Sequence, residues 1–429
     1  MKTINFPPPQ DWESLCSRPE MMKADLEKKV SSIIEDVKIR GDKALFEYGK
    51  QFDGVALQEL KVTPEEIEEA LLSIPEEFKN AISLAKSNIE KFHLAQLKPE
   101  PSVETSPGVT CWRKNVPIEK VGLYVPGGTA PLFSTVLMLG IPAKLAGCTE
   151  ITMCTPPGKN GKINPLILYA AYLTGVNSVF KAGGAQAIAA MAFGTESVTK
   201  VYKIFGPGNQ FVTRAKELVQ LQGTAIDMPA GPSELLVIAD STANPEFIAA
   251  DLLSQAEHGP DSQVLFLTDD KALAKKVIDQ ITKQLPELPR KEIAEKALEK
   301  SLIIILHNID ECISFSNLYA PEHLIITTAD PSDVGNKVIN AGSVFIGKYS
   351  CESAGDYASG TNHTLPTNRY ARISGGVSAD SFVRKITFQE ITTEGIKNIG
   401  PAIEIMAESE NLSAHKNAVS VRLKSIRNV

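Results

Sequence analysis

Gln255 and His258 form the most specific local pattern in the chain, within the stretch LLSQAEHGPDSQ (252–263). They lie three residues apart in what reads as the last turn of a helix, so their side chains share one face. Gly259-Pro260 then ends that helix. The pair is either a polar cap beside the negative helix end or half of a metal site. Local evidence favours the cap, because nitrogen and oxygen coordination needs further residues from elsewhere in the chain.

Glu322 and His323 are neighbours in YAPEHLI, where Pro321 ends a predicted helix just before a strand. Adjacent side chains on an extended chain point to opposite faces, so one interpretation is a solvent-exposed pair. A junction between loop and strand is also a place where catalytic groups are often found. Histidine transfers protons readily near neutral pH, which makes the pair a candidate for acid-base chemistry.

Asp356 and His363 lie in the polar stretch YSCESAGDYASGTNHTLPT (349–367). The stretch has few bulky aliphatic residues and is too long for a simple turn. Long polar loops in compact domains are usually functional or disordered, and the small residues here suggest the wall of a substrate site.

Three glycine-rich turns follow predicted strands, at VPGG (125–128), KAGG (181–184) and GPGN (206–209). Glycine lets the backbone approach a ligand, and a helix that begins there favours an anion. Ligands of open parallel sheets bind outside the carboxyl ends of the strands. The complete G-x-G-x-x-G fingerprint is absent from the sequence, because Phe211 occupies its third glycine position. The three turns together predict a binding crevice.

Composition excludes several classes of protein. The 429 residues suit two or three domains, and a net charge of −7 argues against a nucleic-acid partner. We see neither an apolar run long enough for a membrane span nor a secretory leader, and the six cysteines form no C-x-x-C pair. We therefore expect a cytoplasmic protein that binds neither membrane nor nucleic acid.

The chain divides into four predicted segments. Residues 1–115 read as a helical segment that we expect to pack on the second lobe. Residues 116–234 and 235–378 each alternate short apolar strands with helices, which predicts an α/β fold with two lobes and parallel sheets. Residues 379–429 read as a helical tail, a candidate dimerisation arm.

The chain from Val121 to Val419 resembles the histidinol dehydrogenase family. The resemblance rests on the order and length of eight stretches: VGLYVPGGTAPLFSTVLM, KAGGAQAIAAMAFGTESV, KIFGPGNQFVTRAK, DMPAGPSELLVIAD, LLSQAEHGPDSQ, LYAPEHLI, SAGDYASGTNHTLPT and LSAHKNAV. It implies two Rossmann-like lobes and a homodimer with one zinc ion per subunit. It also implies oxidation of L-histidinol to L-histidine through L-histidinal, in two NAD-linked steps that end histidine biosynthesis.

The resemblance also implies roles for particular residues. His323 matches the general base, and Glu322 matches the residue that activates water. The family's tail reaches the neighbouring subunit, which makes Glu410 and His415 candidates for the partner's site. By residue match the metal ligands are Gln255, His258, Asp356 and His415, the NAD contacts are Tyr124, Gln186 and Asn209, and the substrate contacts are Ser233, Gln255, His258, His323, Asp356, His363, Glu410 and His415.

Two other function classes remain open on the residues alone. A zinc hydrolase would use Glu322 to activate a metal-bound water and would turn over without NAD, against which the glycine-rich strand ends argue. A two-lobed binding protein for a metal-chelating ligand would keep its affinity and function when His323 is replaced by Asn.

Overall fold

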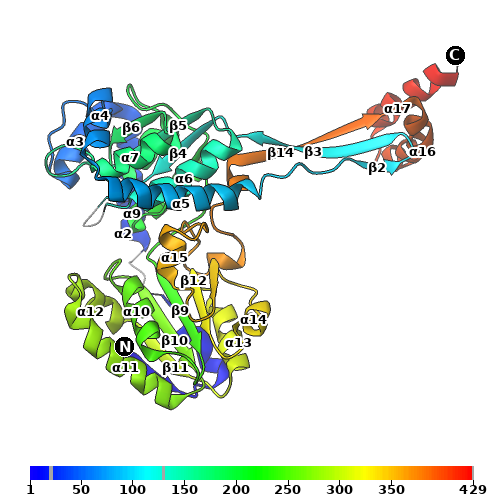
Figure 1. Ribbon diagram of the computed structural model, residues 1–429. Coiled ribbons are helices and arrows are strands. Elements are labelled where there is room, and N and C mark those ends of the chain that lie inside the picture. The colour runs from blue at the N-terminus through cyan, green and yellow to red at the C-terminus, as the bar shows by residue number, and fades with distance from the viewer. Residues whose placement is uncertain (19–22, 128–130, 428–429) are drawn as a thin grey trace. The chain divides into compact units, whose positions relative to one another are not determined.

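The computed structural model describes residues 1–18, 23–127 and 131–427. The chain forms two compact units: Met1–Leu94 with Ile118–Phe382, and Ala95–Pro117 with Val383–Val429. Figure 1 labels the elements of both units. Gly128 of the predicted VPGG turn lies outside the described residues.

The first lobe contains a five-stranded sheet in which every pair of neighbouring strands is parallel. Its strand order is β6-β5-β4-β7-β8, so the order reverses between β4 and β7, where open α/β sheets bind ligands. The strands are β4 (Lys120–Tyr124), β5 (Glu150–Thr155), β6 (Ser178–Lys181), β7 (Lys203–Phe205) and β8 (Ala225–Ile226).

Helices cover both faces of this sheet and form a separate apolar core on each (Figure 1). On one face lie α4 (Pro64–Ser73), α5 (Glu76–Leu94), α6 (Phe133–Ala146) and α7 (Pro165–Thr174). On the other lie α2 (Lys23–Arg40), α3 (Asp42–Tyr48), α8 (Gly184–Phe193) and α9 (Gln210–Gln220).

The second lobe repeats this strand order in a six-stranded parallel sheet, β1-β11-β10-β9-β12-β13, with β1 added at one edge. The strands are β1 (Lys2–Asn5), β9 (Glu234–Ala239), β10 (Gln263–Thr268), β11 (Leu302–Ile305), β12 (His323–Thr327) and β13 (Ser343–Ile346). One face is covered by α10 (Pro245–Ala256), α11 (Lys271–Gln284) and α12 (Lys291–Glu299), and the other by α1 (Trp12–Leu15), α13 (Ile309–Tyr319) and α14 (Pro331–Asn336).

Local sequence explains these elements. Every residue of β9, ELLVIA, is buried, as expected for a central strand covered on both faces. The Asn244 side chain accepts a hydrogen bond from Glu246 N and starts α10, and Pro245 occupies its first position. The predicted α/β fold with two parallel sheets is confirmed.

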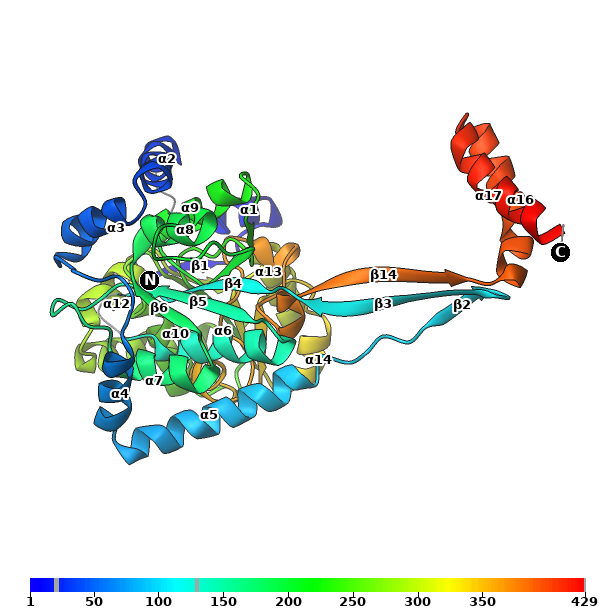
Figure 2. The same ribbon diagram turned by 90° about the horizontal axis from the view of Figure 1, so that it is seen from above.

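The second unit is built differently. Strands β2 (Val103–Ser106), β3 (Val109–Pro117) and β14 (Val383–Ile391) form an antiparallel sheet in the order β14-β3-β2. Helices α16 (Thr393–Ser409) and α17 (Ser413–Arg427) follow and pack on each other (Figure 2). The helical tail is thus confirmed for α16 and α17, whereas residues 383–391 form a strand because they pair with β3, far upstream in the chain.

The expectation for residues 1–115 is wrong in part. Strand β1 and helix α1 pack in the second lobe, on β11 and α13. Helices α2 to α5 pack on the first lobe, and residues 95–117 belong to the second unit. Apolar periodicity identifies the face that a helix buries but not the partner that covers it. The boundary between lobes at residue 234 stays a prediction.

Within the described ranges, no helix combines the length and apolar character that crossing a membrane requires. All six cysteines are free thiols. Burial raises the pKa of Cys154 to about 12 and that of Cys16 to about 11, so both side chains pack as small apolar groups.

Candidate active site

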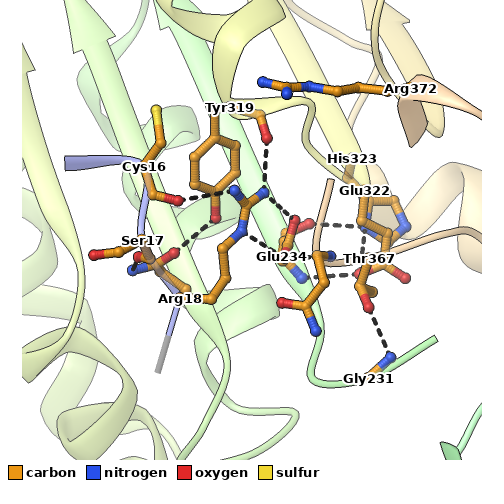
Figure 3. Close-up of polar contacts among 12 residues, drawn as sticks. Cys16, Ser17, Arg18, Gly231, Glu234, Tyr319, Glu322, His323, Thr367 and Arg372 are labelled. Carbon is orange, nitrogen blue, oxygen red and sulfur yellow. Dashed lines mark hydrogen bonds and ion pairs between the residues drawn. The ribbon is translucent and has the colours of Figure 1, made fainter. Parts of the chain in front are cut away.

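Glu322 and His323 lie where β12 begins, at the amino edge of the second sheet. Ala320 adopts a left-handed backbone (φ 54°) at the end of α13, and Pro321 leads into the strand. Both side chains are buried, so the interpretation as a solvent-exposed pair is wrong. Both contact the main chain of Glu234, the first residue of the neighbouring strand β9 (Figure 3).

The main chain of Glu234 orients both side chains. Its N–H donates to Glu322 Oε2 (2.8 Å), and its carbonyl oxygen lies 3.1 Å from His323 Nδ1. A carbonyl can only accept, so Nδ1 carries the proton and Nε2 carries the lone pair. Nε2 is buried and has no hydrogen-bond partner in the described parts of the chain. The expectation that the two side chains point to opposite faces is therefore wrong, since Glu322 precedes the strand and its Oε2 lies 3.6 Å from His323 Nδ1.

Burial sets the protonation states of this pair. It lowers the pKa of His323 to about 4, although the Asp356 carboxylate opposes the change. Burial also raises the pKa of Glu322 well above its usual range, against the hydrogen bond from Glu234. His323 is therefore neutral near pH 7, and burial favours the uncharged form of Glu322, an effect that a nearby positive charge would oppose.

Three side chains beside this pair could hold a metal ion. Ligand atoms of His258, Glu352 and Asp356 all lie within 4.8 Å of one another. Glu352 and Asp356 lie four residues apart on the short helix α15 (Glu352–Tyr357), and His258 follows α10. Asp356 Oδ1 is buried and lacks a hydrogen-bond partner among the residues described. A buried, unpaired carboxylate beside an imidazole fits a divalent cation with nitrogen and oxygen ligands.

Gln255 joins the cluster through Glu352. Its side chain is fully buried, and in the orientation that satisfies both groups its amide nitrogen donates to Glu352 Oε2 (3.0 Å). Burial and the neighbouring Asp356 and Glu322 charges raise the pKa of Glu352 well above its usual range. Gln255 and His258 thus both face α15, which a helix cap alone would not require.

His363 lies where the two lobes meet. Its Nε2 is 3.2 Å from Oγ1 of Thr135, at the start of α6, and its Nδ1 is 3.0 Å from the carbonyl oxygen of Asp356. Asn362 donates to the carbonyl of Met138 in the same helix (2.6 Å). The imidazole is therefore held from both lobes. Ser233, half-buried, directly precedes β9 and thus the residue that orients Glu322 and His323.

A cavity of about 830 Å³ opens at the carboxyl ends of the strands of the first sheet. Tyr124, Gln186 and Asn209 all line it: Tyr124 ends β4, Gln186 lies in the first turn of α8, and Asn209 directly precedes α9. The Tyr124 hydroxyl accepts a hydrogen bond from Gly184 N (3.0 Å), and burial raises its pKa to about 12. The Asn209 side chain accepts hydrogen bonds from Phe211 N and Val212 N and so caps the start of α9. The crevice predicted from the glycine-rich turns is present.

Known proteins resemble this chain along nearly its whole length. The family model for histidinol dehydrogenase matches residues 16–423. The chain is 60% identical over 427 residues to histidinol dehydrogenase of Bacteroides thetaiotaomicron, and the match covers 100% of both chains. It is 51% identical over 422 residues to that of Salmonella typhimurium, covering 98% of this chain and 96% of the relative. A crystal structure of histidinol dehydrogenase from Elizabethkingia anophelis superposes with a TM-score of 0.97 at 58% identity, covering 100% of this chain and 99% of that one.

The chain belongs to the histidinol dehydrogenase family. It is accordingly an NAD-dependent oxidoreductase that catalyses the final step of histidine biosynthesis, with histidinol as its substrate. Histidinol dehydrogenases use NAD and zinc, and the cluster of His258, Glu352 and Asp356 is a possible metal site.

The sequence patterns did not point to every polar residue of the candidate metal site and of the cavity. Glu352 was missed, although its spacing of four from Asp356 in CESAGDY would place both carboxylates on one helical face. Asp53 was missed as well. It lines the cavity of the first lobe, and its Oδ2 is buried without a partner among the described residues.

Two of the residues expected from the histidinol dehydrogenase motifs lie in the second compact unit. Glu410 follows the last residue of α16, and His415 lies in the first turn of α17. Both side chains are exposed. Their assignment to a metal or substrate site stays a prediction.

Proposed function

We propose that the buried cluster at the start of β12 is the catalytic site and that the cavity of the first lobe binds NAD. The observation that carries this proposal is the state of His323. Its Nδ1–H donates to the Glu234 carbonyl, and its Nε2 is an unpaired base 3.8 Å from Asp356 Oδ1. A base with its lone pair free is what alcohol oxidation needs, because the hydroxyl proton must leave as hydride departs.

The metal site is proposed to hold one zinc ion per subunit, with Gln255, His258, Asp356 and His415 as ligands. The buried unpaired oxygen of Asp356, and Glu352 beside it, support a cation at this position. When bound, zinc would attract the amine and imidazole nitrogens of histidinol and favour the ionised forms of the nearby carboxylates. Ser233, His363 and Glu410 are proposed to contact the substrate.

NAD is proposed to bind against Tyr124, Gln186 and Asn209. The cavity lies where the strand order reverses, and its volume is within the range of cofactor sites. Asp53 supports the proposal, because ribose hydroxyls could donate to its unpaired carboxylate oxygen.

The chemistry proceeds in two oxidations. In the first, His323 Nε2 takes the hydroxyl proton of histidinol while the adjacent carbon gives its hydride to NAD, forming histidinal. Glu322 then removes a proton from water as the water adds to the aldehyde, and His323 returns its proton to the aldehyde oxygen, which leaves a diol and a neutral His323. The resulting diol loses a second hydride to another NAD and a proton to His323, which leaves histidine. The sum is two NADH for each histidinol.

The experiment counts NADH. Zinc-loaded protein should form two NADH per histidinol and one per histidinal. Replacing His323 with Asn should suppress both oxidations, since both need the base. Replacing Glu322 with Gln should slow the second one more strongly, so that histidinal accumulates after about one NADH. Two NADH per histidinol at the wild-type rate in Glu322→Gln would contradict the assignment.

We also propose a homodimer in which the tail of each chain completes the partner's site. The second unit exposes several large apolar side chains, as an arm that packs on another chain would. These are Val103, Ile386, Phe388, Ile391, Ile405, Met406, Leu412 and Val421.

A further inference from the structure

Glu234 lies at the centre of a buried polar network that the roles above leave unused (Figure 3). Its carboxylate receives two hydrogen bonds from Arg18, from Nε to Oε1 and from Nη2 to Oε2, each 2.9 Å long. The two side chains are only 7% and 2% exposed. A parallel pair of hydrogen bonds between guanidinium and carboxylate fixes the orientation of both groups. The main chain of the same Glu234 orients Glu322 and His323.

Arg18 is itself held from several sides. Its Nη2 also donates to the carbonyl of Tyr319 (2.8 Å), and its Nη1 donates to the carbonyl of Cys16 (2.9 Å). The guanidinium lies over the Tyr319 ring, 3.5 Å from its centroid, and the ring hydroxyl donates to Gln263 Oε1 (2.8 Å). Arg18 therefore connects the N-terminal segment to the end of α13, just before the catalytic pair.

A third segment reaches the same carboxylate. Asn368 N donates to Glu234 Oε1 (2.9 Å), and Gly231 N donates to Oγ1 of Thr367 (2.7 Å). Asn368 has a left-handed backbone (φ 52°), which is uncommon for a residue other than glycine and needs support from its surroundings. Segments from both ends of the first unit thus converge on one side chain at the start of β9.

We propose that Arg18 and Glu234 are positioning residues for the dehydrogenase reaction. Arg18 holds the Glu234 side chain, and this fixes the peptide N–H and C=O that orient the Glu322 carboxylate and keep His323 in its Nδ1–H form. The inference rests on the roles proposed for Glu322 and His323. Its energetic basis is that a shift of about 1 Å in a catalytic group can cost about a hundredfold in rate.

The alternative is an ordinary buried ion pair that serves only the fold. The two cases differ when both charges are removed. Deleting one partner leaves an unpaired buried charge and destabilises the fold strongly, whereas replacing both partners with neutral residues is often close to neutral for stability. A purely structural pair would then recover activity along with stability. A positioning pair would not, because the peptide at residue 234 would lose its fixed orientation.

The experiment compares Arg18→Met, Glu234→Gln and the double variant, each loaded with zinc and saturated with histidinol. We expect both single variants to melt at lower temperature and the double variant to regain most of that loss. We expect its kcat to stay at least about tenfold below wild type, with KM for NAD unchanged because the NAD cavity lies in the other lobe. A double variant with wild-type melting temperature and wild-type kcat would overturn the proposal. So would a rise in KM for NAD at unchanged kcat.

Two further variants cover folding defects and general effects. Arg18→Lys retains the charge but not the paired geometry, so a stable protein with lowered kcat is expected even if the double variant fails to fold. Wild-type kcat in a stable Arg18→Lys protein would also overturn the proposal. Arg369→Met is the matched control, because the ion pair of Arg369 with Glu13 joins the N-terminal segment to the segment that carries Asn368 but does not involve Glu234. The kcat of this variant should stay at the wild-type value. If His323→Asn retained wild-type activity, the proposed function itself would be wrong, whatever the Arg18 variants do.

Discussion

Asp356 Oδ1 lies 3.8 Å from His323 Nε2, and neither atom has a hydrogen-bond partner within residues 1–18, 23–127 and 131–427. One atom is a carboxylate oxygen suited to a cation, and the other is a base suited to a substrate proton. Their proximity puts the proposed metal site next to the proposed proton acceptor.

The first prediction concerns metal removal. Chelation should abolish NADH formation, and added zinc should restore it. Glu352→Gln should weaken zinc binding by about 10- to 100-fold, because Glu352 is either a ligand or the group that orients Gln255. Elemental analysis and zinc titration measure both effects. Glu257→Gln, next to His258 but outside the cluster, should bind zinc normally. Full activity in metal-free protein would refute the prediction.

The second prediction concerns Tyr124. Its hydroxyl accepts from Gly184 N inside the cavity of the first lobe, so Tyr124→Phe leaves that N–H unpaired. The cost of about 1–3 kcal/mol should raise KM for NAD by about tenfold and change kcat little. Steady-state kinetics with varied NAD measure this effect. Tyr202→Phe, at an exposed tyrosine, should behave as wild type. An unchanged KM for NAD in Tyr124→Phe would place NAD elsewhere.

The third prediction concerns the stability of the fold at low pH. The His93 ring is buried, and its Nδ1 lies 2.9 Å from the Ile89 carbonyl oxygen. Its Nε2 accepts a hydrogen bond from Asn362 Nδ2 (3.3 Å). Burial lowers its pKa below 6.5, although the neighbouring backbone groups of Ile89 and Val377 oppose this change. His93 therefore binds a proton less readily in the folded protein than in the unfolded chain. The His93 contribution to stability is complete above about pH 6.5 and is lost as the pH falls towards the lowered pKa.

Urea unfolding between pH 7.5 and 5.5 tests this prediction. The free energy of unfolding should fall with pH, and His93 should account for at most about 1.4 kcal/mol per pH unit of that slope. His93→Gln should flatten the curve, whereas His307→Gln, at an exposed histidine, should not. Identical slopes in His93→Gln and wild type would show that His93 does not titrate in this way.

The fourth prediction concerns the tail. If His415 serves the partner's site, His415→Ala and His323→Ala proteins should each be inactive but should complement each other after subunit exchange. A dimer with one chain of each variant then holds one intact site out of two. Such dimers make up about half of an equal mixture after exchange, so the mixture should reach about a quarter of wild-type activity. NADH formation after exchange, with mixed dimers verified by mass, provides the measurement. Inactive mixed dimers would mean that each site is built within one chain.

The sequence determined the features that depend on residues close in the chain. Asn244-Pro245 starts α10, and Gly259-Pro260 follows the turn that carries Gln255 and His258. The continuous apolar runs predicted parallel strands buried on both faces, and the central strands of the two parallel sheets are of this kind. These signals are local because capping, turns and periodicity act over one or two turns of chain.

Only the tertiary structure decided which residues meet. Glu352 joins His258 because α15 packs beside α10, and no spacing along the chain encodes that contact. Residues 383–391 form a strand only because β3 is available to pair with them. The orientation of Glu322 and His323 comes from the Glu234 peptide on a neighbouring strand, a contact between residues about 90 positions apart. Such contacts depend on how the elements pack, whereas the sequence pattern specifies each element and the face that it buries.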